Sequence, residues 1–245
     1  WSEPAYPEYH HDPVASSCRG EKFDESITVK KTIDGDTIVL GDGRHLRLIG
    51  IDTPELSHDG SPAQVGAVEA QQYLSGLLRA HDILRLRYDQ ERTDRYGRTL
   101  AHLFLPDGTN VQSLLLERGL ATTLAIPPNL AFAECYATIA TRARSQRSGL
   151  WAYRQYQPTP VAAITRQDLG YRIVLGRIIR TARIRNSFRI DLAANFSLRI
   201  HGKDLQYFPN LERLDGSHVT ALGMLYYSNG AFRMQIRYPT DLVID

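Results

Sequence analysis

Residues 33–55 read IDGDTIVLGDGRHLRLIGIDTPE, and this stretch organises the rest of the chain. Its apolar residues fall into two strand-like runs, and the sequence Gly-Asp-Gly between them is typical of a hairpin turn. Folding back at this turn would bring Asp36, at the start of one strand, near Asp52, at the end of its partner. Two carboxylates close to Arg47 make a candidate site for a divalent metal and a phosphate group. The same spacing also suits a surface hairpin whose acidic side chains serve only solubility, so the hairpin by itself leaves the function open.

Two stretches of sequence downstream of this hairpin favour a functional site over a surface hairpin. Residues 91–101 read ERTDRYGRTLA, and residues 110–121 read NVQSLLLERGLA. Together with DGDT and RLIGIDTPE, and in this order, they closely resemble the staphylococcal nuclease (thermonuclease) family. The resemblance covers about residues 27–151, roughly half of the chain, and implies a nuclease.

The resemblance also implies a metal site within residues 33–55. Asp36 and Asp52 match the metal-binding aspartates of the family, and Thr53 matches the residue that lends its backbone carbonyl. We expect Ca²⁺ as the cofactor, because all-oxygen ligation favours it over zinc and the motif contains no Cys or His.

Three further residues match the catalytic set of the family. Arg47 and Arg98 match the two arginines that grip the phosphate, where a planar guanidinium donates two parallel hydrogen bonds that a lysine cannot reproduce. Glu55 matches the candidate general base for the attacking water. A binding module that had lost catalysis would be expected to lack part of this set.

Substrate contacts are expected from residues outside that set, and here the chain departs from the family. The expected contacts are Arg95, Tyr96 and His58. The loop after Glu55 lacks the lysines of the family, so His58 is at most a partial substitute. Residues 122–128 also lack the tyrosines that flank the substrate base in the family. Both departures should weaken the grip of the first domain on substrate.

The fold class expected is β-rich α+β: an OB-fold five-stranded barrel with three helices, followed by a second small OB-like β-barrel. The first barrel is implied by the family resemblance and fits the order of the elements. We expect an extended tail over residues 1–24, the nuclease-like domain over 25–154, a linker over 155–165 and the second barrel over 166–245. Strands of the first domain are expected at 27–31, 37–40, 45–51, 84–88 and 100–105, with its longest helix at about 129–148.

The second part of the chain is strand-rich and basic. Strands are expected at 171–180, 187–193, 196–201, 219–227 and 231–237, and Asn229-Gly230 is a strong hairpin signal. Residues 1–165 carry 17 Lys and Arg against 20 Asp and Glu, whereas residues 166–245 carry 12 against 7. A local excess of +5 suits a part that holds a polyanion. Its aromatic residues either stack on bases or fill the core, and for any one of them the core is the more common place.

The function expected is that of a calcium-dependent, sugar-nonspecific nuclease that acts on DNA and RNA and leaves 3′-phosphate ends. Single-stranded substrate is the expected preference, and a monomer the expected state. The alternative is a non-catalytic tandem OB-fold module that binds nucleic acid or protein. A further possibility is that the second barrel binds a protein partner without altering the enzyme.

The compartment is expected to be extracellular or periplasmic. The sequence begins with Trp1 rather than methionine, as it would after removal of a signal peptide or trimming of the chain. A bond between Cys18 and Cys135 would suit an oxidising compartment. The two residues are equally compatible with a free thiol in the tail and a buried apolar side chain in a helix. No apolar run approaches the length that crosses a bilayer, so no membrane partner is expected.

Overall fold

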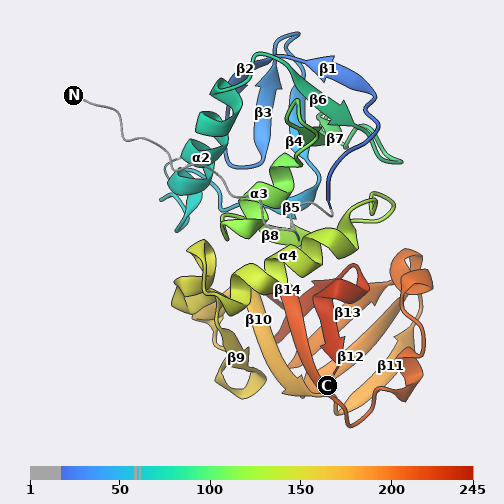
Figure 1. Cartoon of the computed structure of the whole chain (residues 1–245). Helices are drawn as coiled ribbons and strands as arrows, with labels where there is room; N and C mark the ends of the chain where they lie inside the picture. Colours follow the sequence, from blue (N-terminus) through green and yellow to red (C-terminus); the bar gives the residue numbers. More distant parts are fainter. Residues whose placement is uncertain (1–17, 58–59, 61, 245) are drawn as a thin grey trace.

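The computed structural model describes residues 18–57, 60 and 62–244, so most of the expected tail lies outside the described residues. Figure 1 shows two parts stacked along the long axis of the molecule, with the helix α4, Ala133–Ser145, between them. Among the described residues, no helix is long and apolar enough to cross a bilayer.

The first part is built around a six-stranded sheet. Its order is β1 (Glu25–Ile27), β6 (Leu84–Arg87), β7 (Thr99–Phe104), β4 (His45–Leu48), β3 (Thr37–Leu40) and β2 (Val29–Thr32). The strands β4 and β7 run parallel, and the other neighbours are antiparallel. Isoleucine and leucine side chains alternate into the core, with Ile38, Leu46 and Leu48 fully buried. The hairpin between β3 and β4 confirms the turn expected at Gly41-Asp42-Gly43.

Helices and a short two-stranded sheet complete this part. The helices α2 (Ala67–Arg79) and α3 (Val111–Glu117) precede α4, and β5 (Gly50–Asp52) pairs with β8 (Thr122–Leu124). The side chain of Asn110 caps α3 by accepting a hydrogen bond from the Ser113 backbone N–H at 2.9 Å. Cys18 and Cys135 form a disulfide that ties the beginning of the described chain to α4.

Several expected boundaries in the first part were wrong. The single strand expected at 27–31 is two strands, because β1 pairs with β6 whereas β2 pairs with β3. The strand expected at 45–51 is also two strands, because β4 ends at Leu48 and β5 begins at Gly50, whose φ is +86°. The short strand β8 was not anticipated, and α4 begins at Ala133 rather than near residue 129. Among the described residues the sheet runs from β1 to β2 without closing, so the five-stranded closed barrel was not observed.

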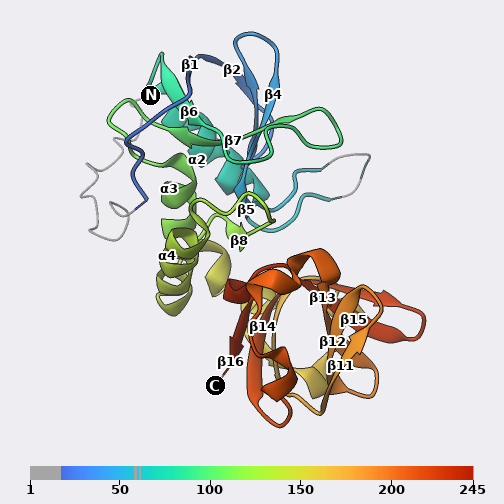
Figure 2. The same ribbon diagram turned by 90° about the vertical axis from the view of Figure 1, so that its right-hand side faces the viewer.

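The second part is one eight-stranded sheet around its own core. The pairing order is β11 (Arg180–Ile184), β12 (Ser187–Ala193), β13 (Phe196–His201), β15 (Ala231–Ile236), β14 (His218–Ser228), β10 (Gly170–Arg177) and β9 (Pro158–Pro160), and β16 (Leu242–Ile244) also pairs with β14. Figure 2 shows these strands curving around their core. Within the described chain the order ends at β11 and β9, so this sheet does not close into a barrel, and an OB-like second domain stays a prediction.

Part of the segment expected to be a linker, Pro158–Pro160, belongs to this second sheet. Its strand β9 pairs in parallel with β10 through Thr159 and Val174. Just before it, Tyr156 packs edge-on against Trp151 and lies beside Tyr171 of β10. These rings form part of a third apolar cluster that joins the two parts. The two parts are therefore held against each other by packing as well as by the chain.

Candidate active site

Asp36 lies at the entrance to β3 and is 5% exposed. The turn before it is fixed locally, because Asp34 Oδ1 accepts the Asp36 backbone N–H at 3.0 Å. Asp36 Oδ1 accepts the Thr37 hydroxyl at 3.0 Å, and its Oδ2 accepts both the backbone N–H and the hydroxyl of Thr53, at 2.9 and 3.1 Å. A carboxylate buried this deeply is held in one orientation by its donors.

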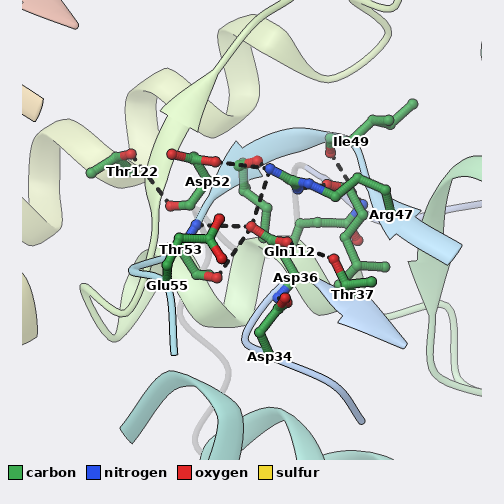
Figure 3. Close-up of polar contacts among 12 residues, drawn as sticks. Asp34, Asp36, Thr37, Arg47, Ile49, Asp52, Thr53, Glu55, Gln112 and Thr122 are labelled. Carbon is green, nitrogen blue, oxygen red and sulfur yellow. Dashed lines mark hydrogen bonds and ion pairs between the residues drawn. The ribbon is translucent and has the colours of Figure 1, made fainter. Parts of the chain in front are cut away.

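Arg47 joins the two aspartates of the expected metal site. It lies on β4 directly opposite Thr37, so the hairpin brings it beside Asp36. Its Nη2 is 3.1 Å from Asp36 Oδ2 and 2.9 Å from Asp52 Oδ1, and its Nη1 donates to the Ile51 carbonyl at 3.0 Å. Figure 3 shows the three side chains pointing toward one another. The structure thus brings Asp36, Arg47, Asp52 and Thr53 together as expected.

Asp52 owes its position to a kink in the backbone. Beyond Gly50, β5 leaves the main sheet and pairs with β8, with Asp52 opposite Thr122. A Cβ atom at Gly50 would lie 2.5 Å from the Tyr136 ring, so both the positive φ and the close packing require glycine. A buried amide that the sequence did not single out supports the kink: Gln112 donates to the carbonyl of Ile49 at 3.3 Å. Only its place in the string NVQSLLLERGLA pointed to Gln112.

Negative charge is in excess in this cluster. Burial raises the pKa of Asp36 to about 7, an effect that Arg47 offsets in part and that the nearby Asp34 and Asp52 increase. Burial also raises the pKa of Asp52 above its ordinary value, although that side chain remains 37% exposed. One guanidinium therefore does not neutralise the carboxylates around it.

A hard divalent cation fits this donor set. The carboxylates of Asp36 and Asp52 are oxygen donors, and Thr53 would add its backbone carbonyl. The described residues contain no cluster of three or more His, Cys, Asp or Glu arranged to hold a metal ion. A site with two carboxylates suits Mg²⁺ or Ca²⁺, which retain water molecules as further ligands, better than it suits zinc.

Glu55 lies three residues beyond Asp52, in the loop that follows β5. Its backbone is fixed from both directions, since its N–H donates to the Gln64 side chain at 3.0 Å and its carbonyl accepts the Gln64 N–H at 2.9 Å. The residue is exposed, and Figure 3 shows its side chain beside Thr53. An exposed carboxylate next to the buried cluster can accept a proton from water.

Arg98 is paired with a carboxylate outside this cluster. Its Nε is 2.8 Å from Asp94 Oδ2, in the loop that precedes β7. Among the described residues, no hydrogen bond or ion pair joins Arg98 to Asp36, Arg47 or Asp52. The pairing of β7 with β4 sets Leu100 beside Arg47, so the loop that holds Arg98 adjoins the cluster.

The other expected substrate contacts divide into two groups. Arg95 and Tyr96 lie in the same loop as Arg98, with the Arg95 guanidinium 4.7 Å from the centre of the Tyr96 ring. Tyr96 is 69% exposed and free to meet a ligand from solvent. His58 lies outside the described residues.

A cleft of about 440 Å³ opens beside this cluster, between the two parts of the molecule. One wall contains Asp52, Thr53 and Glu55, and the other contains Tyr171 and Met224 of the second part. Tyr156 and Arg172 also line it. Sequence reasoning did not identify these residues, and the excess of basic residues after position 165 pointed only to the second part as a whole.

The aromatic residues of the second part are mostly in its core. Phe188, Phe196 and Phe232 are 2–7% exposed, which excludes them from stacking on a base. Tyr226, at 40% exposed, is available to a ligand. The aromatic residues at the cleft are instead Tyr156 and Tyr171.

Comparison with known proteins gives a consistent result. The sequence profile of the family described as "Staphylococcal nuclease homologue" matches residues 45–153. The thermonuclease of Staphylococcus intermedius is 37% identical over 131 residues, which cover 52% of this chain and 76% of that protein. The thermonuclease of Staphylococcus hyicus is 32% identical over 143 residues, 57% and 83% of the two chains. Endonuclease YncB of Bacillus subtilis (strain 168) is 32% identical over 136 residues, 54% and 64% of the two chains.

Proposed function

The chain belongs to the staphylococcal nuclease family and is a nuclease, and we propose that it cleaves both DNA and RNA in a calcium-dependent reaction. The observation that carries this proposal is the convergence of Asp36, Asp52 and Arg47 on one another beside the exposed Glu55. The alternative of a non-catalytic binding module is not favoured, because the named relatives are nucleases and the full set of matching side chains is present.

Asp36 and Asp52 would hold the cation, together with the Thr53 carbonyl. When bound, Ca²⁺ supplies positive charge that polarises the phosphate and stabilises the charge developing on it. The oxygen donors and the excess of negative charge support this assignment.

Arg47 and Arg98 are proposed to grip the phosphate. Arg47 is already held at the edge of the cluster, so its positive charge is in place before substrate arrives. A preorganised donor needs little reorganisation as charge develops, which is where most of its catalytic effect arises. Arg98 and the neighbouring Tyr96 would have to approach from the loop before β7.

Glu55 is proposed as the general base. One of its carboxylate oxygens would take a proton from the water that attacks phosphorus, and the backbone contacts with Gln64 fix the loop from which it acts. Loss of the 5′-oxygen as leaving group would then give products that end in 3′-phosphate.

The preference for single strands, the monomeric state and the compartment are also proposals. The shape of the site between two parts of one chain supports an extended, flexible substrate over a rigid duplex. The disulfide between Cys18 and Cys135 supports an oxidising, secreted or periplasmic setting.

The test is cleavage of labelled single-stranded DNA and RNA of the same sequence, with Ca²⁺ or with EDTA. Native protein should cut both with Ca²⁺ and neither with EDTA. The variant Glu55→Gln should lose roughly 10²–10⁴-fold in rate, the range for a general base, while still binding the strands. Glu21→Gln, an exposed carboxylate remote from the site in sequence, is the matched control. Binding without cleavage under any divalent cation would refute the calcium-dependent reaction.

A further inference from the structure

The outer face of the second sheet carries arginines where the strand pattern places polar side chains. Along β12, Phe188 and Ile190 point into the core, so Arg189 and Asp191 point outward. Directly paired residues on neighbouring strands share a face, and the register therefore shows which outward side chains are neighbours.

One row of this face has two like charges side by side. Arg189 on β12 is directly opposite Arg199 on β13, and Arg199 is beside Gln235 on β15. Like charges directly opposite each other destabilise a sheet. Arg189 and the exposed Arg180 share a single carboxylate, Asp191, at 3.0 and 4.0 Å.

Arg199 has no carboxylate partner among the described residues. It forms no ion pair in the described part of the chain, and its Nε is buried without a hydrogen-bond partner there. A neighbouring row adds a further cation, because Arg233 on β15 is beside Ser197 and opposite Tyr226. Arg233, too, forms no ion pair with a described residue. The face therefore carries positive charge that the described residues do not neutralise.

The row that contains Arg189 and Arg199 leads to the cleft. Leu225 on β14 pairs with Met234 on β15. Because the two strands are antiparallel, the next residues along them, Met224 and Gln235, are also opposite each other. Met224 is in turn opposite Tyr171 on β10, and both residues line the cleft that contains Glu55. Four strand spacings separate β10 from β12, a path of about 19 Å along the sheet.

We propose that this outer face, from Tyr171 to Arg189, is a track for the single nucleic-acid strand whose phosphodiester bond is cut in the cleft. The inference rests on the proposed function and extends it to the substrate beyond the scissile bond. Arg189, Arg199 and Arg233 contact backbone phosphates, and the exposed Tyr226 stacks on a base. The track supplies the grip that the first part lacks, where the expected lysines and tyrosines are missing.

The observations favour a nucleic-acid strand over other polyanions. Arginines spaced along a sheet with an exposed aromatic ring among them match the phosphate and base contacts of single-strand binding surfaces. The face is continuous with the cleft, so a strand bound on it can extend to Glu55. An acidic polypeptide offers no base to stack on Tyr226.

The test uses the full chain with Arg189→Gln and Arg199→Gln combined. Affinity for a labelled 12-mer single strand is measured in EDTA, so that nothing is cut, over a series of salt concentrations. Each phosphate contact on a single strand contributes about 0.7 to the log–log salt slope, so losing two should lower the slope by about 1.4 and weaken binding roughly 20-fold at about 0.1 M salt. With Ca²⁺, the same variant should show a raised KM for the 12-mer and an unchanged kcat/KM for a dinucleotide, which is too short to reach the row.

Two controls separate charge from structure. The pair Arg183→Gln and Arg213→Gln removes the same charge from the second part, on side chains outside the two rows, and should leave both slope and KM near native. The pair Arg189→Lys and Arg199→Lys loses the guanidinium Nε but keeps the charge, so it should restore most of the salt slope.

Failure of the track and failure of the nuclease proposal are distinguishable. If native protein cuts neither the 12-mer nor the dinucleotide, the proposed function is wrong. If it cuts both and the glutamine pair leaves slope and KM unchanged, the track is wrong. Competition by poly-glutamate as effective as that of a single strand of equal charge would also overturn it, because the face would then be a site for any polyanion.

Discussion

The backbone N–H of Thr53 donates to Asp36 Oδ2 at 2.9 Å, and its hydroxyl donates to the same oxygen at 3.1 Å. This contact joins the start of β3 to the residue after β5, 17 positions along the chain. It orients a buried carboxylate in the middle of the candidate site before any ligand is bound. The Thr53 backbone therefore positions the Asp36 carboxylate of the proposed metal site. We expect that Asp36 can be replaced with limited change to the fold.

Replacing Asp36 with Asn should abolish stabilisation by calcium. The amide oxygen can still accept the Thr53 N–H, but it lacks the charge that attracts the cation. Native protein should melt at higher temperature as CaCl₂ is added, because a ligand that binds only the folded state stabilises it. The Tm of Asp36→Asn should stay constant over the same titration. An equal calcium shift in both proteins would place the cation elsewhere.

Replacing Gly50 with Ala should cost both stability and activity. Its φ is +86°, and a Cβ atom there would lie 2.5 Å from the Tyr136 ring. Backbone strain of this kind costs about 1–3 kcal/mol, to which the clash adds. Because Asp52 is two residues beyond the kink, cleavage should fall as well. Urea unfolding and kcat measure the two effects.

Gly43→Ala is the matched control for the kink. Gly43 has a φ of +92°, but an added Cβ meets nothing within 4 Å. It should therefore lose only the conformational part of the stability, and its kcat should stay near the native value. Equal losses in the two variants would show that Tyr136 does not hold the kink.

Buried His102 should make stability fall with pH below the ordinary pKa of imidazole. Burial lowers the pKa of His102 from its usual 6.5, and Arg87 adds a smaller lowering effect. Asp89, whose Oδ2 is 4.0 Å from His102 Nε2, opposes this by raising the pKa. As pH drops through 6.5, the unfolded chain takes up a proton that folded His102 does not. The free energy of unfolding should therefore decrease by up to about 1.4 kcal/mol per pH unit on this account.

The variant His102→Asn should reduce this slope, since it removes the titrating ring and keeps an acceptor for Tyr136. Urea unfolding at several pH values between 7 and 5 measures the difference. His45→Gln, an exposed histidine on β4, should leave the slope unchanged. A native slope that the His102 variant retains in full would contradict the assignment.

Reducing the bond between Cys18 and Cys135 should destabilise the protein. The bond closes a loop of 117 residues, and loops of that length correspond to about 4–5 kcal/mol in the chain-entropy account. Urea unfolding with and without dithiothreitol gives the difference, and the double variant Cys18→Ser with Cys135→Ser should unfold like the reduced protein. Equal stability of oxidised and reduced protein would rule out this contribution.

The hairpin was predictable because its determinants are local. Apolar alternation and the turn at residues 41–43 determine which residues of β3 and β4 face each other, and this places Asp36 near Arg47. The cap of α3 by Asn110 is local in the same way, since its side chain bonds a backbone group three residues away. The division of the strand expected at 27–31 was not predictable in this way, because it depends on the pairing of β1 with β6, which is distant in sequence.

Residues 155–165 show the limit of composition as a guide. Two prolines in a short polar stretch are typical of a linker, yet β9 lies at the edge of the second sheet, where a missing N–H can be tolerated. Only the presence of β10 beside it makes the segment a strand. The same contact sets Tyr156 against Tyr171 and thereby forms one wall of the cleft.

The sequence by itself determined the family, the hairpin and the residues that match a nuclease site, because turns, alternation and motifs are properties of neighbouring residues. The tertiary structure alone decided that Arg98 is paired with Asp94 rather than with a residue of the cluster, and that the second part forms a wall of the cleft. It also decided that Arg189 and Arg199 lie side by side on an outer face. These relationships depend on strand order, on register and on the packing of Trp151 between the two parts, and no local pattern in the chain specifies them.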